Sequence, residues 1–94
     1  MLDKFEQKEK EFQAIIEECF KLFAIKNKHY GNDYFEGDYS ALERWLSVRR
    51  KVARLEAHYK QGQESKLPDE KIEDTWKDLA VYCIMELMIL GDKK

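Results

Sequence analysis

The residues from Leu79 to Leu90 read LAVYCIMELMIL, and this run constrains the fold more than any other part of the chain. Glu86 is its only charged residue, so a helix built from the run is apolar on nearly every side. Such a helix is stable in water only where several neighbours cover it. A chain of 94 residues has few other helices to offer, so we expect further cover from a second copy of the chain. Glu86 would then form an ion pair at the interface between copies, with a role as a ligand in a site as the alternative.

The N-terminal third of the chain has the apolar spacing of one long helix. From Phe12 to Phe23, apolar residues recur at i, i+3, i+4, i+7, i+8 and i+11, which predicts a helix over about residues 2–27. Lys28 to Tyr39, KHYGNDYFEGDY, interrupts this period with two glycines and several other turn-forming residues. We therefore expect a loop here, and it is unusually aromatic for a plain connection.

Two more helices are predicted, and each has a recognisable first turn. Ser40 and Glu43 have the spacing of a capping box, in which each side chain accepts a hydrogen bond from the other residue's backbone N–H. We therefore expect the second helix over about residues 40–60. Pro68 suits the first turn of a third helix, over about residues 68–90, because that turn does not need the N–H that proline lacks.

The composition and net charge favour a folded helical protein over a disordered, nucleic-acid-binding or membrane protein. A chain with 38% charged and 44% hydrophobic residues and one proline is typical of a folded helical protein, so we expect a single all-α domain over residues 1–94. The net charge of −2 gives no positive excess for bulk nucleic-acid binding. We expect no membrane span and a cytoplasmic location, because the sequence has no signal-peptide pattern and no apolar run of about 20 residues. Cys19 and Cys83 lack the spacing of metal ligands and are expected to be reduced thiols in the core.

A row of acids precedes the apolar run. Glu70, Asp74 and Asp78 are four residues apart, which places them along one slowly drifting line on a helix. Such acids repel one another unless a cation such as Mg²⁺ lies between them, although the first two also suit the positive end of a helix dipole on a solvated face. Asp78 lies beside the core and should have a partner. Lys51 and Arg54 can supply it, directly or through a shared phosphate, because they lie on a basic face of the second helix.

Three segments, KNKHYGND, VRRKVARLE and DEKIEDTWKDLAVYCIM, resemble the phage and prophage family called nucleotide-modification-associated domain 1. That family has a Lys-Asn-x-x-Tyr-Gly element, a Lys-x-x-Arg-[Leu/Ile] element and an Asp-Glu-x-Ile-x-Asp-Thr-x-x-Asp-Leu-Ala-x-Tyr-x-Ile segment. It is similar in turn to the all-α nucleotide pyrophosphohydrolases of the MazG type. The likeness covers about residues 25–85 and implies a MazG-like arrangement of helices, an oligomer and, for a phage protein, the host cytoplasm.

The resemblance also implies a site. It implies that Mg²⁺ orients a nucleoside triphosphate and activates water for attack at the α-phosphorus, which releases pyrophosphate. The implied metal ligands are Glu70, Asp74 and Asp78, of which Asp74 and Asp78 are the catalytic residues. The implied phosphate-binding residues are Lys26, Lys51 and Arg54, and the implied base-binding residues are Tyr30 and Tyr34, whose rings offer stacking surfaces.

Three functions remain open at this point. The first is a magnesium-dependent pyrophosphohydrolase that acts on a phage's modified nucleotide pool. MazG-type hydrolases, however, have a Glu-x-x-Glu pair on the helix before the acidic one, and the second helix here has only Glu43 and Glu56, too far apart. The second is therefore a non-enzymatic phage protein that sequesters a nucleotide or nucleotide signal in counter-defence. The third is a helical protein-interaction module with its acids on the surface. We expect a nucleotide ligand and a homodimer or higher homo-oligomer.

Overall fold

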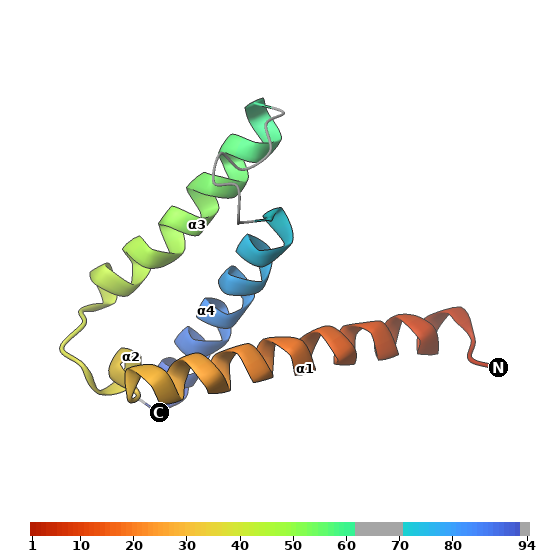
Figure 1. Cartoon of the computed structure of the whole chain (residues 1–94), viewed down its shortest axis with the longest axis horizontal. Coiled ribbons are helices and arrows are strands. Elements are labelled where there is room, and N and C mark those ends of the chain that lie inside the picture. The colour runs from red at the N-terminus through yellow and green to blue at the C-terminus, as the bar shows by residue number, and fades with distance from the viewer. Residues whose placement is uncertain (62–70, 93–94) are drawn as a thin grey trace. The chain divides into compact units, whose positions relative to one another are not determined.

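The structure is a computed structural model that describes residues 1–61 and 71–92. Within these ranges all regular structure is helical, which confirms the all-α class. The helices are α1 (Lys4–Tyr30), α2 (Asp33–Glu36), α3 (Ala41–Gln61) and α4 (Ile72–Asp92), as labelled in Figure 1. They belong to two compact units, Met1–Asn32 and Asp33–Lys94, which we describe separately.

The first unit is built on α1, and both ends of this helix are capped. At its start, Oδ1 of Asp3 accepts a hydrogen bond of 2.8 Å from the backbone N–H of Glu6, and this bond lowers the pKa of Asp3. At its end, Gly31 has a φ of 63°, and its N–H donates to the carbonyl of Asn27. Glycine adopts this left-handed conformation at little cost. The helix therefore ends at Tyr30, before the Gly31 cap, and the prediction of an end near residue 27 was wrong because the apolar period fades before the cap.

The second unit begins with α2, in a segment predicted to be a loop. This one-turn helix closes where the N–H of Gly37 donates to the carbonyl of Asp33 at 2.8 Å. A Cβ atom at Gly37 would lie 2.6 Å from that carbonyl oxygen, so the close approach requires glycine. The hydroxyl of Tyr39 donates to Oδ2 of Asp33 at 2.9 Å and fixes the exit from the turn.

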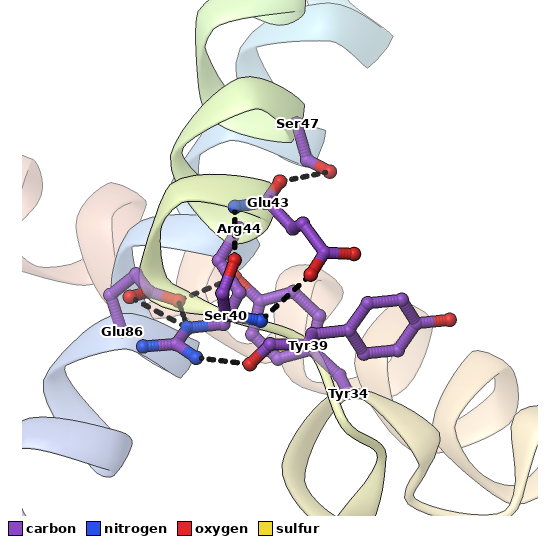
Figure 2. Close-up of polar contacts among 7 residues, drawn as sticks. All are labelled: Tyr34, Tyr39, Ser40, Glu43, Arg44, Ser47 and Glu86. Atoms are coloured by element: carbon purple, nitrogen blue, oxygen red, sulfur yellow. Dashed lines mark hydrogen bonds and ion pairs between the residues drawn. The ribbon is translucent and has the colours of Figure 1, made fainter.

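The capping box at the start of α3 is confirmed. The backbone N–H of Ser40 donates to Oε1 of Glu43, and the backbone N–H of Glu43 donates to Oγ of Ser40, each at 3.1 Å (Figure 2). Both groups would otherwise lack a partner within the helix. The start of this helix is therefore set by its local sequence, as predicted.

Helix α4 begins and ends later than predicted. Lys71 precedes the helix, and its carbonyl accepts hydrogen bonds from the N–H groups of Asp74 and Thr75 at 3.0 and 3.4 Å. Residues 68–70, where the start was predicted, lie outside the described residues. The helix continues through Gly91 to Asp92, because Gly91 does not take the left-handed conformation that ends α1 at Gly31.

Helices α3 and α4 run side by side in opposite directions in the second unit (Figure 1). Leu55 from α3 and Thr75 and Met85 from α4 are its buried residues, and Thr75 has no exposed surface. Cys83 is exposed, so its predicted place in the core was wrong; Cys19 is buried, and both thiols are free of disulfides. In the two described ranges, no helix has the length and apolar character that a membrane crossing requires.

Candidate functional site

The partner predicted for Asp78 is confirmed in its direct form. Nζ of Lys51 on α3 donates to Oδ2 of Asp78 on α4 at 3.1 Å. Both side chains are about three-quarters covered, with exposed fractions of 26% and 20%. A carboxylate beside a core is costly without a counter-charge, and the ammonium group supplies one here.

A second ion pair joins the same two helices. Nε of Arg44 on α3 donates to both oxygens of Glu86 on α4, at 3.2 and 3.0 Å, and Nη1 donates to the carbonyl of Tyr39 at 3.0 Å. The hydroxyl of Tyr34 donates to Oε2 of Glu86, so α2, α3 and α4 all contribute to one cluster (Figure 2). The ion pair that we expected Glu86 to form with a second copy is thus formed within the chain.

Tyr34 is held in this cluster by its ring as well as by its hydroxyl. Its ring centroid lies 5.9 Å from that of Tyr82 and 5.7 Å from that of Phe35. Burial raises the pKa of Tyr34 well above its ordinary value, and the hydrogen bond to Glu86 and the charge of Glu86 act in the same direction. These contacts give the implied base-binding tyrosine a packing role.

The raised pKa of Tyr34 predicts a specific dependence of stability on alkaline pH. Below the ordinary value of 10.0, Tyr34 is neutral in both the folded and the unfolded chain, so its contribution is complete. As the pH rises further, the unfolded chain ionises first and the contribution is lost. We expect the stability advantage of the natural chain over Tyr34→Phe to be constant from about pH 7 to 10 and to shrink above pH 10. Urea unfolding at each pH measures it, and parallel curves above pH 10 would contradict the assignment.

The acidic row is only partly within the described residues. Glu70 lies outside them, Asp74 is exposed in the first turn of α4, and Asp78 is bound to Lys51. Among residues 1–61 and 71–92, no three His, Cys, Asp or Glu side chains come together as a group that could hold a metal ion. Mg²⁺ is often held by one or two carboxylates with phosphate oxygens, and Asp74 and Asp78 match that number. The fit is incomplete, because Mg²⁺ at Asp78 would have to displace the Lys51 ammonium.

The basic face of α3 is better formed than the acidic row. Lys51, Arg54 and His58 are all partly buried, and they occupy one side of the helix. The ring of His58 packs edge-on against that of Tyr59, with centroids 4.9 Å apart. Its buried Nδ1 atom has no hydrogen-bond partner among the described residues. We define Lys51, Arg54, His58 and Asp78 as the polar face of the α3–α4 pair.

The implied residues of the first unit, Lys26 and Tyr30, both lie on α1, although residue 30 was predicted to lie in the loop over residues 28–39. Lys26 and Tyr30 are exposed there, and the ring of Tyr30 lies edge-on to that of His29 at 5.1 Å. The other implied phosphate-binding residues, Lys51 and Arg54, belong to the second unit. The candidate site is therefore defined by the polar face alone.

Two contacts were missed by sequence reasoning. Arg44 lies seven residues before Lys51, so it shares the same side of α3, and this spacing was a signal for its pairing with α4. The hydrogen bond of 3.0 Å from Nε1 of Trp76 to the hydroxyl of Tyr59 joins the helices at their other end and had no comparable signal.

The polar face thus combines the ion pair of Lys51 and Asp78 with the side chains of Arg54 and His58, and nitrogen-bearing groups of this kind suit an anion. In comparisons with known proteins, the chain matches no family model, no curated protein and no solved structure.

Proposed function

We propose that this chain binds the phosphates of a nucleotide at the polar face of the α3–α4 pair. The observation that carries the proposal is the alignment of Lys51, Arg54 and His58 on α3, all partly buried, opposite the carboxylate of Asp78. The resemblance of three sequence segments to a nucleotide-modification-associated family supports a nucleotide as the source of the phosphates.

The burial of these groups favours phosphate binding over loose attraction of ions. Charges that are partly removed from water interact more strongly with a ligand, because the effective dielectric constant is lower and salt screens them less. The guanidinium group of Arg54 can donate two parallel hydrogen bonds to a phosphate, whereas the ammonium of Lys51 acts as a compact charge. In this proposal Asp78 orients the Lys51 ammonium in the free protein, and a bound phosphate replaces Asp78 as its partner.

Magnesium-dependent hydrolysis of a nucleoside triphosphate is the second candidate. It is favoured by Asp74, whose exposed carboxylate lies one helical turn before Asp78 on the same helix. Bound Mg²⁺ would polarise the phosphate oxygens and activate water. Asp74 and Asp78 would hold it, and Lys51 would then turn from Asp78 to a phosphate oxygen.

The direct test of phosphate binding compares two arginines of α3. Arg54→Ala removes a guanidinium from the polar face, and Arg49→Ala removes an exposed one elsewhere on the same helix. A hydrogen bond to a charged group contributes about 1.5–3 kcal/mol, so we expect Arg54→Ala to weaken nucleotide binding by about 10- to 100-fold. Isothermal titration calorimetry with a panel of ribo- and deoxynucleoside triphosphates measures this, and Arg49→Ala should bind as the natural chain does.

The conditions of the titration separate the three functions. Binding in chelator without pyrophosphate release supports a protein that captures a nucleotide or nucleotide signal, as a phage could use against a host defence. Pyrophosphate release that requires Mg²⁺ supports the hydrolase. If no nucleotide binds or is turned over, the proposal is wrong and a helical interaction module is the better interpretation.

A further inference from the structure

The side of α4 that faces away from α3 is apolar and exposed. Leu87 and Met88 are 66% and 44% exposed, and Ile84 is 41% exposed. On a helix these positions follow one another along a single stripe. We define the outer face of α4 by five exposed apolar residues, which are Ala80, Cys83, Ile84, Leu87 and Met88.

The outer face is also uncharged over most of its length. Between Lys77 and Asp92 the charged residues are Asp78 and Glu86, and both side chains point to the other side of the helix, where they bind Lys51 and Arg44. From residue 80 to residue 88 the helix rises about 12 Å. An exposed apolar stripe of this length, with charges only at its ends, is typical of a surface that another helix covers.

We propose that the outer face of α4 binds the same face of a second copy, with the two α4 helices antiparallel about a twofold axis. In such an interface each residue meets the same surface of the partner, so a charge near the axis would face its own kind. The outer face has none there. This inference does not depend on the proposed function, because the polar face lies on the opposite side of α4.

The residue pattern fits one antiparallel register. If Ile84 packs against the partner's Leu87, then Ala80, four residues earlier, packs against the partner's Gly91, four residues later, because the two helices are antiparallel. Small residues at both ends of the contact let the two backbones approach closely. Cys83 then lies near the twofold axis and close to the partner's Met88.

The charges at the ends of the outer face are complementary in this arrangement. Asp92 stands at the negative end of its own helix dipole, where an acid is unfavourable. In this antiparallel register Asp92 lies opposite the partner's Leu79, about 3 Å along the helix axis from the partner's Lys77. A parallel pair would instead place like charges together at each end.

The size of the contact determines how the test must be run. A helix contact about 12 Å long buries less than the roughly 800 Å² per partner of a standard stable interface. The dimer is therefore reversible, and the measurement has to cover a range of protein concentrations. We expect sedimentation velocity on the full chain to show a shift from monomer to dimer with increasing concentration.

The variant Leu87→Glu places a charge beside the axis, once in each copy. We expect it to raise the dimer dissociation constant by at least about 30-fold, because the substitution acts twice in a symmetric interface. Leu42→Glu is the matched control, since Leu42 is 65% exposed and lies on α3. It should dimerise as the natural chain does. Circular dichroism confirms that both variants keep their helices, and equal dissociation constants for the two would overturn the proposal.

Cys83 supplies an independent measurement on the same face. In a Cys19→Ser background, a short bismaleimide should link two chains through Cys83, and Leu87→Glu should abolish the link while making Cys83 react faster with a monofunctional maleimide. A chain that stays monomeric at all concentrations overturns the proposal.

Discussion

Replacing Arg44 by leucine is expected to lower the free energy of unfolding by about 2–4 kcal/mol. The substitution leaves the carboxylate of Glu86 without its counter-charge, at a position where that side chain is only 31% exposed. Breaking a fully buried ion pair in this way costs about 3–5 kcal/mol, and the partial exposure of Glu86 reduces the cost. The hydrogen bond from Arg44 to the carbonyl of Tyr39 is lost as well. Urea unfolding followed by circular dichroism measures the change.

Two further variants show whether the charge is responsible. Arg49→Leu removes an exposed arginine from the same helix and should change the unfolding free energy by less than about 0.5 kcal/mol. In the double variant Arg44→Leu/Glu86→Leu, no buried charge is left unpaired, so most of the lost stability should return. If the double variant is less stable than Arg44→Leu, the carboxylate is not the source of the cost.

Replacing Asp78 by asparagine is expected to tighten nucleotide binding by about tenfold in the absence of Mg²⁺. The change removes the negative charge that now holds Lys51 and that would repel a phosphate bound beside it. A unit charge at about 4 Å contributes roughly 1–4 kcal/mol between bulk water and a protein surface, and the tenfold change corresponds to the low end of that range. Calorimetric titration in chelator measures the affinity.

The same variant separates binding from catalysis. If the chain is a hydrolase, Asp78→Asn removes an implied metal ligand and should abolish pyrophosphate release while the helices remain folded. Asp74→Asn is the comparison, because Asp74 is exposed and lacks the contact with Lys51. It should leave binding in chelator nearly unchanged. An Asp78→Asn variant that hydrolyses nucleotide at the natural rate would remove Asp78 from the metal site, and weaker binding in chelator would contradict the phosphate proposal.

The helices could be predicted from the sequence where a local signal sets them. The capping box at Ser40 and Glu43 depends on side chains three residues apart, and it forms as predicted. The end of α1 was misplaced because the apolar period fades before Gly31, whose positive φ stops the helix. The short helix α2 was missed because its turn depends on a close backbone approach at Gly37 and on the bond from Tyr39 to Asp33. The spacing of apolar residues along the sequence does not reveal either contact.

For the candidate site, the sequence could predict which charged residues lie beside the core and therefore need a partner. Asp78 follows polar residues and precedes an apolar run, so a partner was needed, and Lys51 provides it. The same reasoning predicted that Glu86 needs a positively charged partner, but it assigned that partner to another copy of the chain. The sequence of the apolar run does not indicate that Arg44 lies opposite Glu86 on α3. Cys83 was placed in the core because its neighbours are apolar, although its side of α4 is exposed. Which side of an apolar helix is covered depends on its neighbours.

The two ion pairs between α3 and α4 together determine how the two helices are aligned along their axes. Arg44 and Lys51 are separated by seven residues on one helix, and Asp78 and Glu86 by eight on the other. A slip of α4 by one turn would carry both carboxylates about 5.4 Å past their partners and break both contacts at once. Intermediate alignments gain neither pair and place charge against the buried Leu55 and Thr75. The pair of helices therefore has one alignment in which both ion pairs form, and this alignment fixes the spacing of the polar face.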